Sequence, residues 1–155
     1  GSAISPQNSF AFIQGLETLP LRFRAHQDNA LALAHYLKNH SKVSRVIHPS
    51  LFTGLERERA DKYLISGFGP IVGMELTGGE SAGKQFIDSL KMFYHVANIG
   101  DVRTLAIHPA STTHSQLSAD DQLKSGVTPG YIRFAAGIEH IDDIIADVEQ
   151  ALATI

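Results

Sequence analysis

Residues 6–39 form one long stretch compatible with helix, and its length limits how the rest of the chain can fold. Ser5 is a good N-cap, and Pro6 suits the first helical position, where its missing N–H is not needed. Apolar side chains recur at helical spacing as far as Leu37. Pro20 lies in the middle and removes one hydrogen bond, so we expect the helix to bend there.

A straight helix of this length does not fit inside a domain of 155 residues. About 33 residues span roughly 50 Å, whereas a domain of this size has a radius of gyration of only about 15 Å. The first half is therefore expected to project and to expose an apolar stripe, formed by Phe10, Phe12, Ile13 and Leu16. We expect the natural partner of this stripe to lie outside the chain.

The remaining sequence alternates between short apolar runs and helical patterns, separated by Gly and Pro turns. The patterns predict strands at residues 43–47, 71–76, 102–107 and 131–136. They predict helices at residues 56–64, 81–90, 119–124 and 141–152, the last strongly amphipathic. About four strands interleaved with helices indicate an α/β fold. We expect a small, mixed or mostly antiparallel sheet covered by helices, rather than a doubly wound parallel sheet.

Composition is that of an ordinary globular chain and excludes several function classes. The net charge of −3 and the lack of a polybasic run argue against binding to nucleic acid or a membrane surface. No apolar run approaches the roughly 18 residues of a membrane-spanning helix. Cysteine is absent, which removes disulfide and thiol chemistry and suits a cytoplasmic protein. Gly1 and Ser2 are expected to be the remnant of a cleaved tag.

One stretch comes close to a phosphate-binding P-loop. Residues 78–85 read GGESAGKQ and lie between a predicted strand and a predicted helix. Gln85 replaces the Ser or Thr that contacts Mg²⁺ in a P-loop, and Glu80 would place an anion inside the phosphate cradle. A plain glycine turn is the better interpretation.

The histidines do not form a metal-binding pattern. His108 and His114 have a proline between them, and neither a zinc-finger spacing nor an H-E-x-x-H motif occurs. We expect both to be hydrogen-bonded loop residues near the substrate, with no metal site. His26, His35 and His40 are expected on the surface of the long helix.

A polar turn and a later arginine make the strongest candidate site. Residues 98–101, Asn-Ile-Gly-Asp, read as a turn, since Gly tolerates positive φ and Asn and Asp bond their own backbone. Arg133 lies in an otherwise uncharged strand, where a guanidinium needs a partner. Its planar fork suits a carboxylate bound through two hydrogen bonds. The residues alone leave two alternatives: an internal ion pair with Asp or Glu, or the carboxylate of a small substrate.

Four motifs carry a resemblance to a known family, in order from about Ala3. They are SPQNSFAFIQGLETLPLR, HPSL, NIGDVRTLAIHPASTTHSQL and GYIRFAAGIEHIDDIIADVEQAL. The chain resembles the C-terminal part of the Cys/Met-metabolism family of pyridoxal-phosphate (PLP) enzymes. The resemblance implies the small C-terminal domain of fold-type I PLP-dependent transferases. Residues 3–39 would be a long interdomain helix bent at GLETLPLR, residues 40–155 a substrate-positioning domain, and a large PLP-binding domain would precede them.

The resemblance also implies an activity on a small amino-acid substrate. It favours the sulfhydrylase branch, which converts O-acetylhomoserine and sulfide to homocysteine and acetate in a homotetramer. The cystathionine γ-synthase and methionine γ-lyase branches stay open, as does, from another class, a stand-alone ligand-binding module. Arg133 matches the arginine that binds the substrate carboxylate in this family. Asn98 occupies a turn position that is a serine in many relatives and contacts the same carboxylate.

In this family PLP is held by a lysine of the large domain. None of the lysines in this chain lies in a context such as S-[AT]-[TS]-K. The chain is therefore expected to contain no catalytic residue and no cofactor-binding residue, and to be inactive by itself.

Overall fold

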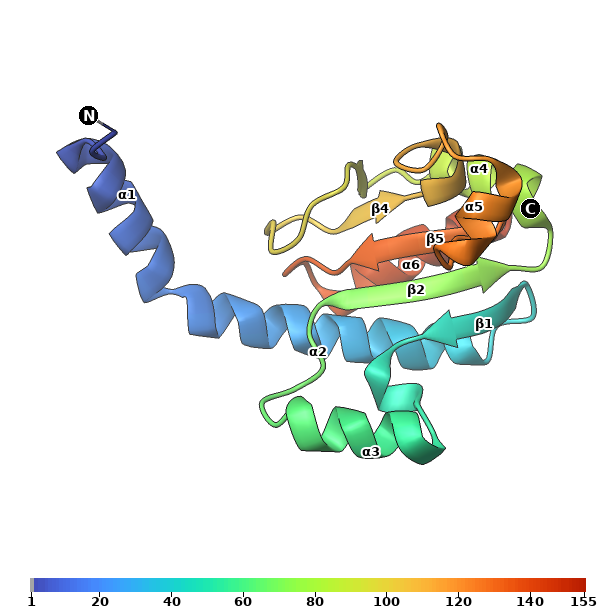
Figure 1. The fold of residues 1–155 in the computed structure, drawn as a ribbon, viewed down its shortest axis with the longest axis horizontal. Coiled ribbons are helices and arrows are strands. Elements are labelled where there is room, and N and C mark those ends of the chain that lie inside the picture. Colours follow the sequence, from blue (N-terminus) through green and yellow to red (C-terminus); the bar gives the residue numbers. More distant parts are fainter. Residues whose placement is uncertain (1) are drawn as a thin grey trace.

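A single mixed sheet lies at the centre of the molecule. The computed structural model describes residues 2–155, and its strands follow the order β1-β2-β5-β4-β3 (Figure 1). They are β1 Val43–Ile47, β2 Ile71–Leu76, β3 Tyr94–His95, β4 Leu105–Ile107 and β5 Tyr131–Ala135. Strand β5 is antiparallel to both of its neighbours, β2 and β4, whereas β3 pairs with β4 in parallel.

The α/β fold is confirmed, but the sheet differs in detail from the prediction. It has five strands rather than about four, because the short strand β3 has too few residues for a recognisable pattern. The strand expected at 102–107 begins only at Leu105. Val102 and Arg103 belong to the preceding turn, where the Asp101 carboxylate accepts the backbone N–H of Arg103 at 3.0 Å.

Helices cover one face of the sheet and build the core. The helices are α1 Pro6–Glu17, α2 Leu19–Lys38, α3 Gly54–Tyr63, α4 Gly79–Ser89, α5 Ala119–Lys124 and α6 Ile141–Leu152. Two 3₁₀ turns, η1 Pro49–Leu51 and η2 Pro109–Ser111, complete the list. Helix α6 contacts both α2 and α4, and α2 and α4 contact the sheet. In the core, the Phe134 ring meets the rings of Phe86 and Phe93 edge-on, at 6.0 and 5.8 Å.

The long helical stretch consists of two helices that meet at Thr18. The predicted cap is confirmed, since the Ser5 hydroxyl accepts the N–H of Asn8 at 3.2 Å. The predicted bend is also present, but it lies two residues before Pro20. Pro20 cannot donate to the carbonyl of Leu16 and would clash with it, so the first ladder ends earlier and the proline falls in the first turn of α2.

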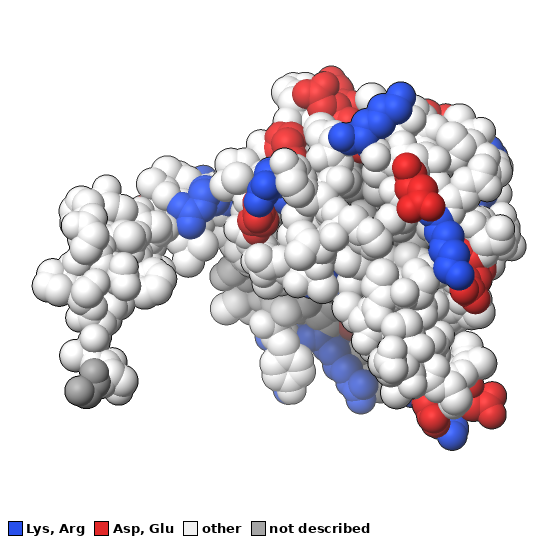
Figure 2. Space-filling model, turned by 90° about the horizontal axis from the view of Figure 1, so that it is seen from above, with Lys and Arg blue, Asp and Glu red and all other residues white. Residues whose placement is uncertain are grey.

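Helix α1 projects from the body of the molecule (Figure 1). None of its described residues is buried, and its apolar side chains are open to solvent, with Phe12 65% exposed. In Figure 2 the projecting part is almost free of charged side chains. The overhang expected from helix length is therefore present. Within residues 2–155, no helix combines the length and the apolarity that crossing a membrane requires.

His26 is not on the helix surface, so that expectation was wrong. It is only 1% exposed, and its Nδ1 lies 2.7 Å from the carbonyl oxygen of Ala136. The helix face that carries His26 also carries Ala30 and Leu33, and this face packs on the sheet. A buried imidazole is tolerated here because a backbone carbonyl satisfies it.

Candidate functional site

Arg133 lies on the face of the sheet opposite the helical core. Its strand neighbours Ile132 and Phe134 are fully buried in the core, so the alternation of a strand directs Arg133 to the other face. It is paired in register with Gly73 of β2 and Ile107 of β4, and its side chain is half-buried. The central position of β5 holds the base of this side chain rigidly.

The Arg133 guanidinium is not paired with an acid. Its Nη2 donates a hydrogen bond to the backbone oxygen of Asn98 at 3.3 Å. Within residues 2–155, no carboxylate lies within 4.0 Å of it; the arginine ion pairs are those of Arg45, Arg57 and Arg103. The internal ion pair, one of the two alternatives left by the sequence, is not formed. The guanidinium keeps donors that can bind an external carboxylate.

The charges around Arg133 also favour an anion. Burial raises the pKa of the neighbouring Tyr131 hydroxyl, while the positive charges of Arg133 and Arg45 oppose that rise. Arg45 is paired with Glu75 at 3.3 Å, so its charge is partly offset. Arg133 has no such partner in the described part of the chain, and it therefore supplies positive potential to this face.

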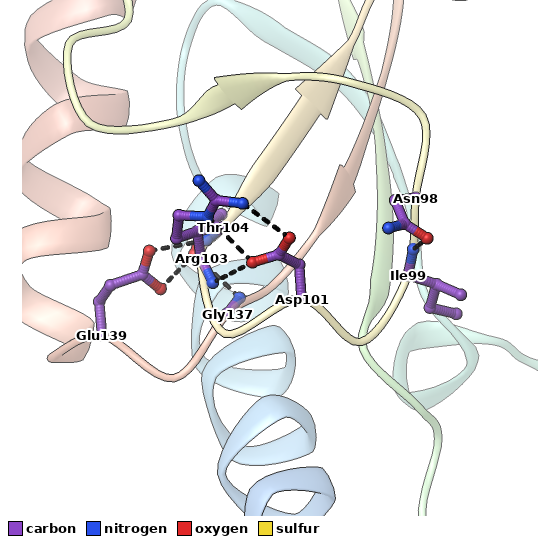
Figure 3. A network of polar contacts seen from close by, with 7 residues as sticks. All are labelled: Asn98, Ile99, Asp101, Arg103, Thr104, Gly137 and Glu139. Carbon is purple, nitrogen blue, oxygen red and sulfur yellow. Dashed lines mark hydrogen bonds and ion pairs between the residues drawn. The ribbon is translucent and has the colours of Figure 1, made fainter. Parts of the chain in front are cut away.

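Asn98 lies beside Arg133 on an exposed turn. Its backbone oxygen accepts from Arg133, while its side-chain Oδ1 accepts the N–H of Ile99 at 2.9 Å (Figure 3). The structure thus brings together the two residues that the sequence indicated. The observed link runs through the Asn98 backbone, and the side-chain NH₂ remains available to a ligand.

An ion pair braces the turn that presents Asn98. Arg103 donates to both carboxylate oxygens of Asp101, with Nε–Oδ1 and Nη2–Oδ2 distances of 3.0 and 3.1 Å (Figure 3). The hydrogen bonds from Arg103 lower the pKa of the Asp101 carboxyl from 3.8 to about 2. The Arg103 guanidinium also stacks on the Tyr94 ring, 4.0 Å from its centroid.

Sequence reasoning missed a second set of contacts behind this turn. Thr104 is completely buried, and both its backbone N–H and its hydroxyl donate to the Glu139 carboxylate (Figure 3). His140 caps α6, accepting the N–H of Asp142 at 3.3 Å, whereas the side chain of the adjacent Glu139 turns to Thr104.

The histidines do not converge on a metal, and no cluster of metal-binding side chains occurs within residues 2–155. His108 is buried; its Nε2 lies 2.7 Å from the carbonyl oxygen of Pro129 and its Nδ1 lies 2.8 Å from the Ser111 hydroxyl. His114 contacts Thr113 through Nδ1 at 2.9 Å. Both are hydrogen-bonded loop residues, as the sequence suggested.

A Schiff base with PLP needs a lysine. Among the described lysines, Lys84 contacts Glu80, Lys124 contacts Asp121, and Lys42 contacts the carbonyl of Leu152. A hollow of about 470 Å³ between α2 and residues 66–68 is not lined by Arg133 or Asn98.

Comparison with known proteins gives a consistent result. A family model described as "Cys/Met metabolism PLP-dependent enzyme" matches residues 1–153. The chain is 51% identical to an O-acetyl-L-homoserine sulfhydrylase of Leptospira meyeri, over 100% of its length. It is 46% identical to a homocysteine synthase of Schizosaccharomyces pombe, over 98% of its length. It spans only 35% of each of these relatives, about a third of their length.

A solved structure supports the same grouping. A Campylobacter jejuni protein described as an O-acetylhomoserine (thiol)-lyase superposes with a TM-score of 0.89 at 36% sequence identity. The match covers 99% of this chain and 36% of that one. The Campylobacter structure contains a pyridoxyl-lysine phosphate group.

Proposed function

Since the chain belongs to the Cys/Met metabolism family of PLP-dependent enzymes, we propose that it is the substrate-positioning part of an O-acetylhomoserine sulfhydrylase. The whole enzyme would convert O-acetylhomoserine and sulfide to homocysteine and acetate. The observation that carries this proposal is the Arg133 guanidinium, which lies beside the Asn98 turn and has no acidic partner within residues 2–155.

In this proposal Arg133 binds the α-carboxylate of the amino-acid substrate. A guanidinium and a carboxylate match in geometry, and two parallel hydrogen bonds fix the direction of the ligand as well as its position. The Asn98 side-chain NH₂ would donate to the same carboxylate. Holding the carboxylate limits rotation of the substrate, so that the reacting carbon meets groups outside this chain in one orientation. PLP, held by those other groups, would supply the electron-withdrawing chemistry.

We propose the same division of labour for the domains. The exposed stripe formed by Phe10, Phe12, Ile13 and Leu16 supports the view that residues 3–39 are an interdomain helix covered by a preceding PLP domain. Residues 40–155 would be the small domain. We further propose a cytoplasmic homotetramer for the whole enzyme, which light scattering on that enzyme would test.

The names of the relatives favour the sulfhydrylase branch over the cystathionine γ-synthase and methionine γ-lyase branches. Product analysis separates them, because a sulfhydrylase forms homocysteine from O-acetylhomoserine and sulfide. A stand-alone ligand-binding module would need a self-contained surface, and the open apolar side chains of α1 argue against one.

The experiment is a kinetic comparison of the whole enzyme that contains this chain. Arg133→Ala is expected to lower kcat/KM for O-acetylhomoserine roughly 30- to 5,000-fold, because the substrate carboxylate loses its charged partner. This corresponds to a loss of about 2–5 kcal/mol of transition-state stabilisation. Arg45→Ala is the matched control, since Arg45 already pairs with Glu75 at the sheet edge. An unchanged kcat/KM in Arg133→Ala would rule out the proposed role.

A further inference from the structure

Behind the Asn98 turn lies a compact polar contact, here called the Thr104 clamp and formed by Thr104, Gly137 and Glu139. Thr104 N–H donates to Glu139 Oε1 at 2.7 Å, and the Thr104 hydroxyl donates to Glu139 Oε2 at 2.8 Å. The same hydroxyl accepts the N–H of Gly137 at 2.9 Å (Figure 3). The clamp therefore joins the start of β4 to the chain that leaves β5, although Thr104 and Glu139 are 35 residues apart.

The two segments joined by the Thr104 clamp are too close together to accept a side chain at Gly137. A Cβ added to Gly137 would lie 2.2 Å from Glu139 Oε2 and 2.4 Å from the backbone nitrogen of Thr104. Glycine is therefore required for the two segments to approach this closely. The hydroxyl of Thr104 is fully buried, so water cannot replace a lost bond without a rearrangement.

One side of the clamp is anchored to helix α2. Asn29 Nδ2 donates to the carbonyl oxygens of Gly137 and Glu139, at 3.0 and 2.9 Å. His26 contacts the carbonyl of Ala136 at 2.7 Å. The segment that carries Glu139 is thereby fixed to helix α2. Its hydrogen bonds to Thr104 therefore fix the position of Thr104 as well.

The other side of the clamp leads directly to the carboxylate site. Val102 accepts the N–H of Ile138 at 2.9 Å, so the end of the turn is tied to the same segment. The start of the turn carries Asn98, whose backbone oxygen accepts from Arg133. Displacement of Thr104 would therefore move Asn98 relative to Arg133.

We propose, resting on the proposed function, that Thr104 and Glu139 are positioning residues for the substrate carboxylate. They touch no substrate themselves. They set the distance between the Asn98 turn and the Arg133 guanidinium, and so determine how tightly the amino-acid substrate binds.

The test compares Thr104→Val with Thr104→Ser in the whole enzyme. Valine keeps the shape but removes the hydroxyl, whereas serine restores it. Thr104→Val is expected to raise KM for O-acetylhomoserine about tenfold, the scale of one or two lost buried hydrogen bonds, with kcat and the KM for sulfide changed less than about twofold. Thr104→Ser is expected to bind substrate like the wild type.

The control is Thr128→Val, which makes the same chemical change at a buried hydroxyl without a hydrogen-bond partner within residues 2–155. It should leave KM unchanged. Should Thr104→Val fail to fold, Glu139→Gln takes its place, because its amide oxygen still accepts one Thr104 bond while the other is lost. A purely structural role predicts lower stability with unchanged KM, and that result would overturn the proposal.

Hydrogen–deuterium exchange separates this proposal from the proposed function. Exchange of residues 98–103 should rise in Thr104→Val and not in Thr128→Val, whatever the substrate is. An inactive wild type with this exchange pattern contradicts the sulfhydrylase function alone. An active wild type whose Thr104→Val variant keeps both KM and exchange contradicts the clamp alone.

Discussion

Replacing Asp147 by alanine is expected to destabilise the chain by about 2–6 kcal/mol. Asp147 lies on α6, is only 7% exposed, and binds the backbone that follows α4. Its carboxylate accepts the N–H groups of Lys91 at 3.0 Å and Met92 at 2.9 Å, with a longer contact of 3.4 Å to that of Phe93.

The magnitude follows from the donors that are left behind. An N–H group that is shielded from water and lacks an acceptor costs about 1–3 kcal/mol. Alanine removes the acceptor of at least two part-buried donors, the N–H groups of Lys91 and Met92. This loss is a large share of the 5–15 kcal/mol or so that stabilises a typical domain. Asp147→Asn keeps one acceptor oxygen but turns an NH₂ group toward the backbone donors, so an intermediate loss of about 1–3 kcal/mol is expected.

Urea unfolding followed by circular dichroism measures these differences. Asp143→Ala is the control, because Asp143 is an exposed carboxylate in the first turn of the same helix and contributes at most about 1 kcal/mol through the helix dipole. If Asp147→Ala unfolds within about 0.5 kcal/mol of the wild type, the reasoning from unsatisfied donors is wrong.

Three further predictions concern titration and cofactor binding. The Asp101 carboxyl should titrate near its lowered pKa of about 2 in NMR and return toward 3.8 in Arg103→Gln; because the folded pKa is depressed, the ion pair stabilises fully above pH 3.8 and is lost as the pH falls through about 2. Burial, and then the hydrogen bond to Glu149, raises the pKa of Tyr36 from 10.0 to about 12, so this contribution to stability is full below pH 10 and is lost as the pH rises toward 12. Glu149→Gln should lower that pKa only in part, as read from tyrosinate absorbance, and a full return to 10.0 would contradict the role of burial. The chain alone should show no saturable visible absorbance band with PLP at one equivalent per chain, and such a band would contradict the absence of a cofactor lysine.

Much of the fold could be predicted because it depends on local patterns. The final helix buries the apolar face that its period predicted, with Ile144, Val148 and Leu152 in the core. The bend near Pro20 and the cap at Ser5 also follow from the chemistry of single residues. In each case the deciding interaction lies within a few positions along the chain.

The parts that could not be predicted depend on distant partners. Glu139 has the sequence context of a helix cap, and only the folded chain places it against Thr104. The sequence around His26 predicts an exposed helix position, and only the folded chain places the carbonyl of Ala136 beside it. Strand β3 forms through its pairing with β4 and has no strand pattern in its own sequence.

The candidate site shows both situations. Arg133 was indicated by its charge in an apolar strand and by the family motif. Its contact with the Asn98 backbone could not be predicted, because every residue has a backbone carbonyl and the sequence does not show which one Arg133 contacts. The proposed binding of a substrate carboxylate at this contact is tested by a binding measurement.

The most direct test compares two ligands without a leaving group in the whole enzyme: norleucine, which has an α-carboxylate, and pentylamine, which lacks it. Calorimetry should show that Arg133→Ala weakens the binding of norleucine by at least about 2 kcal/mol and leaves the binding of pentylamine unchanged. Equal losses for both ligands, or no loss for norleucine, would contradict the claim that Arg133 holds the substrate carboxylate.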